Sequence, residues 1–200
     1  MKKFIWLASY PKSGNTMLRL FLSSYFFTDD GKINTLKTIK HITNFQSLIL
    51  SLNNVPSYEE FKKDLTKVCP LWIDAQKFHA PKIKKFILLK THNFMGSING
   101  HPLTNAAYTK GFIYIVRDPR SVVLSTKHHY DFTIEKAVES LSNDKNFSLG
   151  TRTPVPEFIT SWRTHYMSWK KYSLEVPSII IKYEDLVKSP NIYFMKILKF

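Results

Sequence analysis

The segment 10–16, YPKSGNT, has the residue types that bind a phosphate or another oxyanion. Lys12 supplies a mobile positive charge, and Ser13 and Thr16 supply hydroxyl donors. Gly14 allows a tight turn that points several backbone N–H groups at one spot. The common nucleotide-binding loop, GxxxxGK[ST], has its lysine after a second glycine, whereas Lys12 precedes a lone glycine. The segment alone is therefore equally consistent with an oxyanion site at a strand–helix junction and with an ordinary tight turn in which Lys12 is solvated.

Further polar groups follow other apolar runs of the sequence. Apolar residues at 4–8, 86–89, 111–116 and 177–183 predict four strands buried on both faces. The groups at or just beyond their ends are Lys12, His92, Arg117 and Tyr183. Because ligands bind at the carboxyl ends of parallel strands, we expect one cationic, histidine-containing site at one edge of the sheet.

The segments between these strands predict the helices that cover the sheet. Helical spacing or helix-start signals are found at 17–22, 38–52, 58–68, 119–130, 134–141, 157–172 and 190–200. We expect a capping box at 57–60, a connector bounded by Pro70 and Pro81, and a loop at 96–104. Alternating strands and helices predict an α/β fold: one domain over 1–200, with three layers and a mostly parallel central sheet. We expect helices to cover both faces of this sheet, and the first strand, loop and helix to form a P-loop-like phosphate site.

The composition restricts the classes of partner. The net charge of +14 and a pI of about 9.7 favour polyanionic ligands. The lysines are spread out, with no run of five basic residues, so we do not expect nucleic-acid binding. No apolar run approaches the ~20 residues of a membrane span.

The chain has one cysteine, Cys69, and hence no intramolecular disulfide, which favours a reducing, cytoplasmic location. No local signature makes Cys69 a catalytic thiol, so we interpret it as a buried structural residue. No His/Cys cluster has zinc-ligand spacing, and we expect no metal. We interpret His128 and His129, at the end of a predicted helix, as capping or surface groups, with acceptor-site residues as the alternative.

Four motifs, in order over residues 4–200, resemble the sulfotransferases that use 3′-phosphoadenosine 5′-phosphosulfate (PAPS). YPKSGNT at 10–16 resembles their YPKSGTT loop for the 5′-phosphosulfate, and KTH at 90–92 resembles the segment that supplies the catalytic base in the cytosolic branch. VRDPRSVVLS at 116–125 resembles their 3′-phosphate segment, and YEDL at 183–186 the segment whose tyrosine lies near the adenine. Each motif is moderately specific alone, whereas four in order are highly specific.

The resemblance implies a role for each matched residue. His92 would be the general base, Lys12 would meet the bridging and leaving oxygens, and Lys90 would place charge near the sulfonate. The residues implied in donor binding are Lys12, Ser13, Gly14, Asn15, Thr16, Met17, Arg117, Ser125 and Tyr183. A base with a pKa near 7 would suit the step, which transfers a sulfuryl group to a hydroxyl or amine by in-line displacement. The acceptor is expected to be a small molecule or carbohydrate, bound by loops within 33–80 and 131–156.

The sequence departs from the family pattern in three places. Met17 replaces the aromatic residue expected to stack on adenine, and Asn15 replaces the first threonine of the loop but can still donate a hydrogen bond. A Gly-rich basic segment like RKGxxGDW, which closes over the donor in the family, does not occur before Phe200. We therefore expect a short or C-terminally truncated sulfotransferase domain. The oligomeric state stays open.

Two other functions stay open at this point. One is a non-catalytic truncated domain that binds PAP-like nucleotides or polyanions. The other is a P-loop phosphotransferase, which would need a Mg²⁺-holding acidic residue at a strand end. The nearest candidate, Asp118, has the features of a helix N-cap followed by Pro119.

Overall fold

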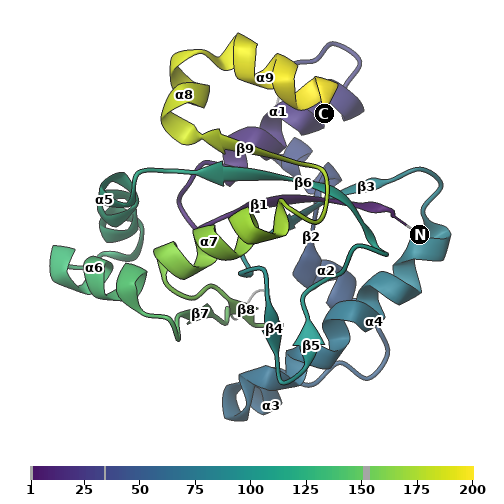
Figure 1. The fold of residues 1–200 in the computed structure, drawn as a ribbon, viewed down its shortest axis with the longest axis vertical. Helices are drawn as coiled ribbons and strands as arrows, with labels where there is room; N and C mark the ends of the chain where they lie inside the picture. The colour runs from purple at the N-terminus through teal and green to yellow at the C-terminus, as the bar shows by residue number, and fades with distance from the viewer. Residues whose placement is uncertain (1, 34, 151–153) are drawn as a thin grey trace.

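The structure, a computed structural model, describes residues 2–33, 35–150 and 154–200. At its centre is a five-stranded sheet in the order β2-β3-β1-β6-β9, in which every neighbouring pair is parallel (Figure 1). The strands are β1 (Phe4–Ser9), β2 (Thr43–Asn44), β3 (Ile87–Thr91), β6 (Thr109–Val116) and β9 (Ser178–Lys182). The predicted α/β fold with a parallel central sheet is confirmed.

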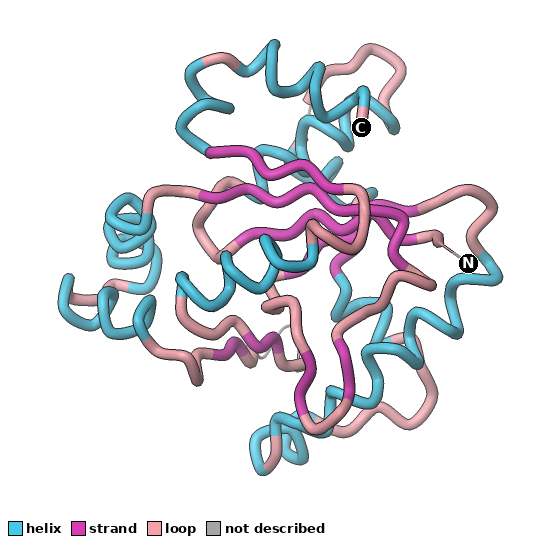
Figure 2. The backbone as a smooth tube through the Cα atoms, in the orientation of Figure 1, coloured by secondary structure: helices cyan, strands magenta, loops and turns pink. Residues whose placement is uncertain are grey.

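Helices cover both faces of this sheet, as the tube in Figure 2 also shows. One face packs against α2 (Phe45–Leu50), α4 (Cys69–His79) and α7 (Trp162–Tyr172), and the other against α1 (Asn15–Phe27), α8 (Tyr183–Lys188) and α9 (Pro190–Lys199). Alternate side chains of β1 enter opposite cores, with Trp6 in the first and Leu7 in the second, both fully buried. The continuous apolar run of β1 is therefore explained by burial on two sides.

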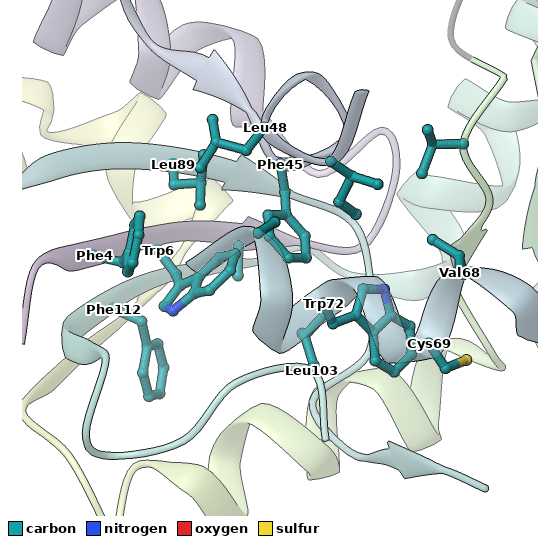
Figure 3. Close-up of a cluster of buried hydrophobic side chains, with 14 of the residues drawn as sticks. Phe4, Trp6, Phe45, Leu48, Val68, Cys69, Trp72, Leu89, Leu103 and Phe112 are labelled. Atoms are coloured by element: carbon teal, nitrogen blue, oxygen red, sulfur yellow. The ribbon is translucent and has the colours of Figure 1, made fainter. Parts of the chain in front are cut away.

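Aromatic packing holds β1 in place (Figure 3). The Trp6 ring meets the Phe45 ring edge-on, with centroids 5.0 Å apart, and its indole N–H donates to Thr109 Oγ1 at 3.1 Å. The loop 10–16, which is predicted to bind an oxyanion, therefore begins at the end of a tightly packed strand.

The remaining elements are short or peripheral. They are α3 (Tyr58–Lys63), α5 (Pro119–Tyr130), α6 (Ile134–Ser142), the 3₁₀ helices η1 (Leu36–His41), η2 (Leu65–Val68) and η3 (Ala80–Lys82), and the two-residue strands β4 (Ser97–Ile98), β5 (His101–Pro102), β7 (Phe147–Ser148) and β8 (Glu157–Phe158). Two predicted helix starts are confirmed: Ser57 forms a capping box with Glu60, and the Asp118 carboxylate accepts from the Arg120 amide. Within the described residues, no helix is both long enough and apolar enough to cross a membrane.

The prediction of one helix over 38–52 is wrong. The segment forms part of η1, then β2, then α2, because its apolar residues divide between the two cores. Ile42 packs in the core of α1, whereas Phe45 and Ile49 pack in the core of α4. The chain must therefore cross the sheet edge, and it does so at Thr43–Asn44, which pairs with β3.

The prediction of one helix over 157–172 is also wrong at its start. Residues Glu157–Phe158 form β8, which pairs with β7, and α7 begins only at Trp162, with Ser161 as its N-cap. The Phe158 amide donates to Asn93 Oδ1 at 2.8 Å, so a contact with a distant loop outweighs the helical preference.

Three smaller predictions also differ from the structure. The expected helix over 58–68 breaks at Asp64, whose carboxylate caps η2. The expected connector after Pro70 is α4, with that proline in its first turn, where it needs no N–H partner. The loop expected at 96–104 contains a short antiparallel pair, β4–β5.

Candidate functional site: an anion-binding cavity at the sheet edge

Four strands of the sheet end around one cavity of about 430 Å³. Figure 1 shows β6 leading into α5 and β9 into α8 at the same end of the sheet. Eight of the residues predicted for the site line this cavity: Lys12, Gly14, Asn15, Thr16, His92, Arg117, Ser125 and Tyr183. The parallel sheet therefore brings together side chains that are up to 171 positions apart, from 12 to 183.

Gly14 is required by geometry at the turn from β1 into α1. Its φ of 102° lies in the left-handed region, and it is the N-cap of the 13-residue helix α1. A Cβ at this position would lie 2.5 Å from Cδ2 of the Tyr183 ring. The aromatic ring of α8 therefore packs directly on the backbone of the loop, at the positive end of the α1 dipole.

Two cationic side chains, Lys12 and Arg117, lie beside the N-terminal end of α1 and line the same cavity. Arg117 Nη1 donates to the Lys12 carbonyl at 2.9 Å, and the Arg117 guanidinium lies 4.6 Å from the centroid of the Tyr183 ring. Partial burial and the charge of Arg117 lower the pKa of Lys12. Two neighbouring positive charges repel each other, so an anion between them would be stabilised.

Ser13 and Asn15 take inward positions in the loop. Ser13 does not line the cavity; its side chain is buried, and its Oγ is one of the buried oxygens with no partner among the described residues. Asn15 is 7% exposed and uses its amide to donate to the Leu7 carbonyl at 3.1 Å and to Ser9 Oγ at 3.3 Å. These two bonds brace the loop against the strand, while Asn15 also lines the cavity. The Thr16 side chain is exposed and faces the cavity.

A second, more apolar cavity of about 610 Å³ adjoins the first and shares Gly14, Thr16 and Tyr183 with it. Met17 lines this second cavity and not the first. The other apolar groups in its wall are Leu20, Phe21, Tyr25, Ile33 and Phe194. The structure thus separates Met17 from the cationic groups and places Tyr183 between the two cavities.

His92 has a defined tautomer. Its Nδ1 lies 2.7 Å from the Ser9 carbonyl, which can only accept, so Nδ1 carries the proton and Nε2 carries the lone pair. Burial and the nearby charge of Lys90 lower the pKa of His92 to about 3, although Glu157 and the bond to Ser9 act in the opposite direction. The imidazole is therefore neutral at pH 7, and its pKa lies well below the value near 7 expected from the sequence.

Lys90 does not line the cavity. Its Nζ lies 3.3 Å from Glu157 Oε1, and both side chains are about nine-tenths buried, at 10% and 7% exposed. Burial lowers the pKa of Lys90. Burial alone would raise the pKa of Glu157, but Lys90 and His92 bring it below the usual value, which is consistent with an ion pair. The charge of Lys90, expected near the sulfonate, is thus already matched by a carboxylate.

Glu157 is a residue that the sequence reasoning missed. It lines the cavity and accepts a hydrogen bond from the His92 backbone amide at 2.8 Å. The sequence offered no local signal for it, because Glu157 stands at the start of the segment predicted as a helix. His129 also lines the cavity although its side chain is exposed, so its interpretation as only a capping or surface group is incomplete.

A third cavity of about 340 Å³ continues from the first, sharing Pro11, Tyr130, Ser148 and Ile159 with it. Its other apolar lining groups are Tyr10, Phe132, Leu141, Phe147 and Leu149. The cavity belongs partly to the region 131–156, where acceptor-binding loops were expected. Residue 34 and residues 151–153 of the two expected loop regions lie outside the described residues.

Among the described residues, no three His, Cys, Asp or Glu side chains are grouped so that they could hold a metal ion. The polar lining of the first cavity in this part of the chain comes from lysine, arginine, histidine, amide and hydroxyl groups and from one carboxylate, Glu157.

Solved structures share this fold. A mouse sulfotransferase, SULT7A1, complexed with PAP superposes with a TM-score of 0.56 at 20% identity over 98% of this chain and 57% of that one. Retinol dehydratase in a complex with retinol and PAP gives a TM-score of 0.54 at 18% identity over 94% of this chain and 57% of that one. The sulfotransferase domain of the Synechococcus PCC 7002 olefin synthase gives 0.51 at 19% identity over 100% and 74%. This chain thus spans 57% of the length of the first two structures.

Sequence comparison identifies the family. A direct search of curated protein sequences finds no significant match. The sequence profile described as "Sulfotransferase domain" matches residues 2–200. Since that match spans nearly the whole chain, the protein belongs to the sulfotransferase-domain family.

Proposed function

We propose that this chain transfers a sulfuryl group from PAPS to a hydroxyl or amine of a small-molecule or carbohydrate acceptor. The observation that carries the proposal is the cationic cavity at the sheet edge, which is lined by Lys12 and Arg117 together with neutral His92. Family membership and neighbours complexed with PAP support the same activity.

The loop residues fit a bound anion. The N-terminus of α1 lines the cavity with Gly14, Asn15 and Thr16, and the neighbouring Ser13 Oγ has no partner among the described residues, so that a phosphate or sulfonate oxygen can bind there. Lys12 and Thr16 would hold the 5′-phosphosulfate, with Lys12 neutralising the charge that develops on the leaving oxygen.

Arg117 and Ser125 would bind the 3′-phosphate, because both line the first cavity. The adenine would lie in the adjoining apolar cavity, between the Tyr183 ring and Met17. The Tyr183 ring also packs on the Arg117 guanidinium, 4.6 Å from the ring centroid, and both side chains line the first cavity.

His92 would act as the general base. PAPS supplies a sulfur whose bond to the bridging phosphate oxygen breaks as the bond to the acceptor oxygen forms, releasing PAP. Nε2 of His92 takes the proton of the acceptor hydroxyl, while Nδ1–H stays on the Ser9 carbonyl. Negative charge bound beside Lys12 would raise the pKa of His92 from about 3, so that the base becomes effective when the donor is in place.

The third cavity would bind the acceptor. It joins the first through shared wall residues and is lined mainly by aromatic and aliphatic groups. Retinol in one neighbouring structure, together with PAP, supports a small apolar alcohol as one kind of acceptor.

The test begins with calorimetric titration of PAP and of ADP, which lacks the 3′-phosphate. We expect PAP to bind at least tenfold more tightly, about 1.4 kcal/mol. Equal affinity for the two nucleotides would exclude PAPS-specific binding.

Transfer is then measured as PAP release from PAPS with a panel of phenols, aliphatic alcohols, sugars and amines. His92→Ala should abolish release and leave PAP affinity within about twofold, because the imidazole acts on the acceptor. His128→Ala, an exposed position on α5, is the matched control. Selective PAP binding without any transfer would instead favour the non-catalytic alternative.

A further inference from the structure

The peptide groups on both sides of His92 are held by side chains from two other elements. Glu157 Oε1 of β8 accepts from the His92 N–H at 2.8 Å. Nε2 of His165, in α7, lies 3.1 Å from the His92 carbonyl. The bond from His92 Nδ1 to the Ser9 carbonyl attaches the imidazole itself to the end of β1.

The hydrogen-bond partners of His165 determine which nitrogen carries its proton. The His92 carbonyl can only accept, so Nε2 of His165 must be the donor. In the neutral ring Nδ1 is then the acceptor, and the Tyr114 hydroxyl donates to it at 2.8 Å. His165 is fully buried, and burial lowers its pKa to about 4, so the ring is neutral at pH 7.

The neighbouring residues reinforce the same attachment. The Asn93 carbonyl accepts from the Trp169 indole at 3.1 Å, and the Met95 amide donates to Ser168 Oγ at 2.9 Å. Both partners lie in α7, so the loop after β3 is bonded to that helix over several consecutive peptide groups.

We infer that His165 is a positioning residue for the general base, and that with Glu157 it clamps the His92 peptide so that Nε2 faces the cavity. This inference rests on the proposed function for its effect on rate. A displacement of about 1 Å at a reacting group can cost on the order of 100-fold in rate, so a clamp remote from the substrate can still control catalysis.

The alternative is that His165 serves only as a hydrogen-bonded core residue of α7. Two substitutions separate the two roles. His165→Gln keeps an N–H donor that can reach the His92 carbonyl, whereas His165→Leu removes it. Tyr172→Leu is the control for lost packing, since Tyr172 is buried in the same helix and packs on Phe112.

The first readout is kinetic. We expect His165→Leu to lower kcat about 100-fold with PAP affinity unchanged within twofold, and His165→Gln to restore kcat to within about fivefold of wild type. Tyr172→Leu should lower stability and keep kcat within about twofold at a temperature where it is folded. Equal losses of kcat in Tyr172→Leu and His165→Leu would overturn the inference.

The second readout does not depend on activity. Imidazole ¹⁵N NMR of the unliganded protein should show His92 as the Nδ1–H tautomer in wild type and His165→Gln, and as a mixture of tautomers in His165→Leu. An unchanged single tautomer in His165→Leu would overturn the clamp. If wild type releases no PAP with any acceptor, the proposed activity fails, while the NMR comparison still decides the clamp.

If His165→Leu does not fold, His165→Met supplies the same test. It also removes the N–H that donates to the His92 carbonyl, and it fills the buried site with a flexible apolar side chain. His92 should then lose its single tautomer, and an unchanged spectrum would again contradict the clamp.

Discussion

Acidification should destabilise this fold through one buried histidine, His165, and one partly buried histidine, His92. The pKa of His92 is lowered from 6.5 to about 3 and that of His165 from 6.5 to about 4, in both cases mainly by burial. Between pH 6.5 and those values the unfolded chain binds protons that the folded protein does not. The contribution of the two neutral imidazoles to the free energy of unfolding is therefore complete above pH 6.5. It is lost as the pH falls from 6.5 toward 4.

The loss of free energy of unfolding at a given pH depends only on that pH and on the pKa in the unfolded chain, provided that the pKa in the folded protein is well below that pH. At pH 5 an unfolded imidazole is almost fully protonated and the folded one is neutral, which costs about 2 kcal/mol per histidine and about 4 kcal/mol for the pair relative to pH 8. The charged groups that influence His92 are Lys90 and Glu157, and Glu157 also influences His165. Carboxylates titrate in the same acid range, so a single substitution is needed to isolate one imidazole.

The assay is urea unfolding of wild type and His165→Gln at pH 8 and pH 5. The fall in the free energy of unfolding between the two pH values should be about 2 kcal/mol smaller in His165→Gln, because glutamine does not titrate. His128→Gln, at an exposed position on α5, is the matched control and should retain most of the wild-type fall. If wild type and His165→Gln lose the same free energy, the folded protein protonates His165, and the account of a buried neutral imidazole is wrong.

Three further predictions test the cavity. Gly14→Ala should lower the free energy of unfolding in urea by about 1–2 kcal/mol, because alanine is strained in the left-handed backbone region. It should also weaken PAP binding at least tenfold in calorimetry, because the added Cβ displaces the Tyr183 ring. Wild-type affinity for PAP would contradict the contact between Gly14 and Tyr183. Arg117→Ala should weaken PAP by about 1.5–3 kcal/mol and leave ADP nearly unchanged in the same titration, and equal losses for both nucleotides would refute the assignment of Arg117 to the 3′-phosphate. Glu157→Gln should destabilise the fold by about 3–5 kcal/mol because it leaves the Lys90 ammonium buried without a counter-charge, and adding Lys90→Met should recover most of that loss. If Glu157→Gln leaves the free energy of unfolding unchanged, the ion pair of Lys90 and Glu157 does not stabilise the fold.

Several features of this protein could be predicted from short stretches of sequence. Apolar runs such as Phe4–Ser9 predict buried strands because continuous hydrophobicity reflects burial on both faces. The caps at Ser57 and Asp118 are equally local, since a capping side chain bonds a backbone amide two or three residues away. The convergence of Lys12, His92 and Arg117 followed from one rule, that parallel strands present their carboxyl ends at one edge.

Other features depended on which distant segments meet. The segment 38–52 has helical spacing, yet Ile42 and Phe45 belong to opposite cores, and no periodicity reveals which face of a sheet a residue will reach. Lys90 stands in a motif that predicts a cation near the reacting group. In the fold its ammonium is instead paired with the carboxylate of Glu157, 67 positions away.

The chain alone therefore determined the four longer strands of the sheet, the loop at the end of β1 and the residue types offered to an anion. Only the tertiary structure decided that Glu157 and His165 hold the His92 peptide and that Met17 lies apart from the cationic groups. The physical reason is that caps, turns and strand burial arise from interactions within a few residues. The pKa and orientation of a buried imidazole arise instead from desolvation and hydrogen bonds contributed by segments that are adjacent only after the chain has folded.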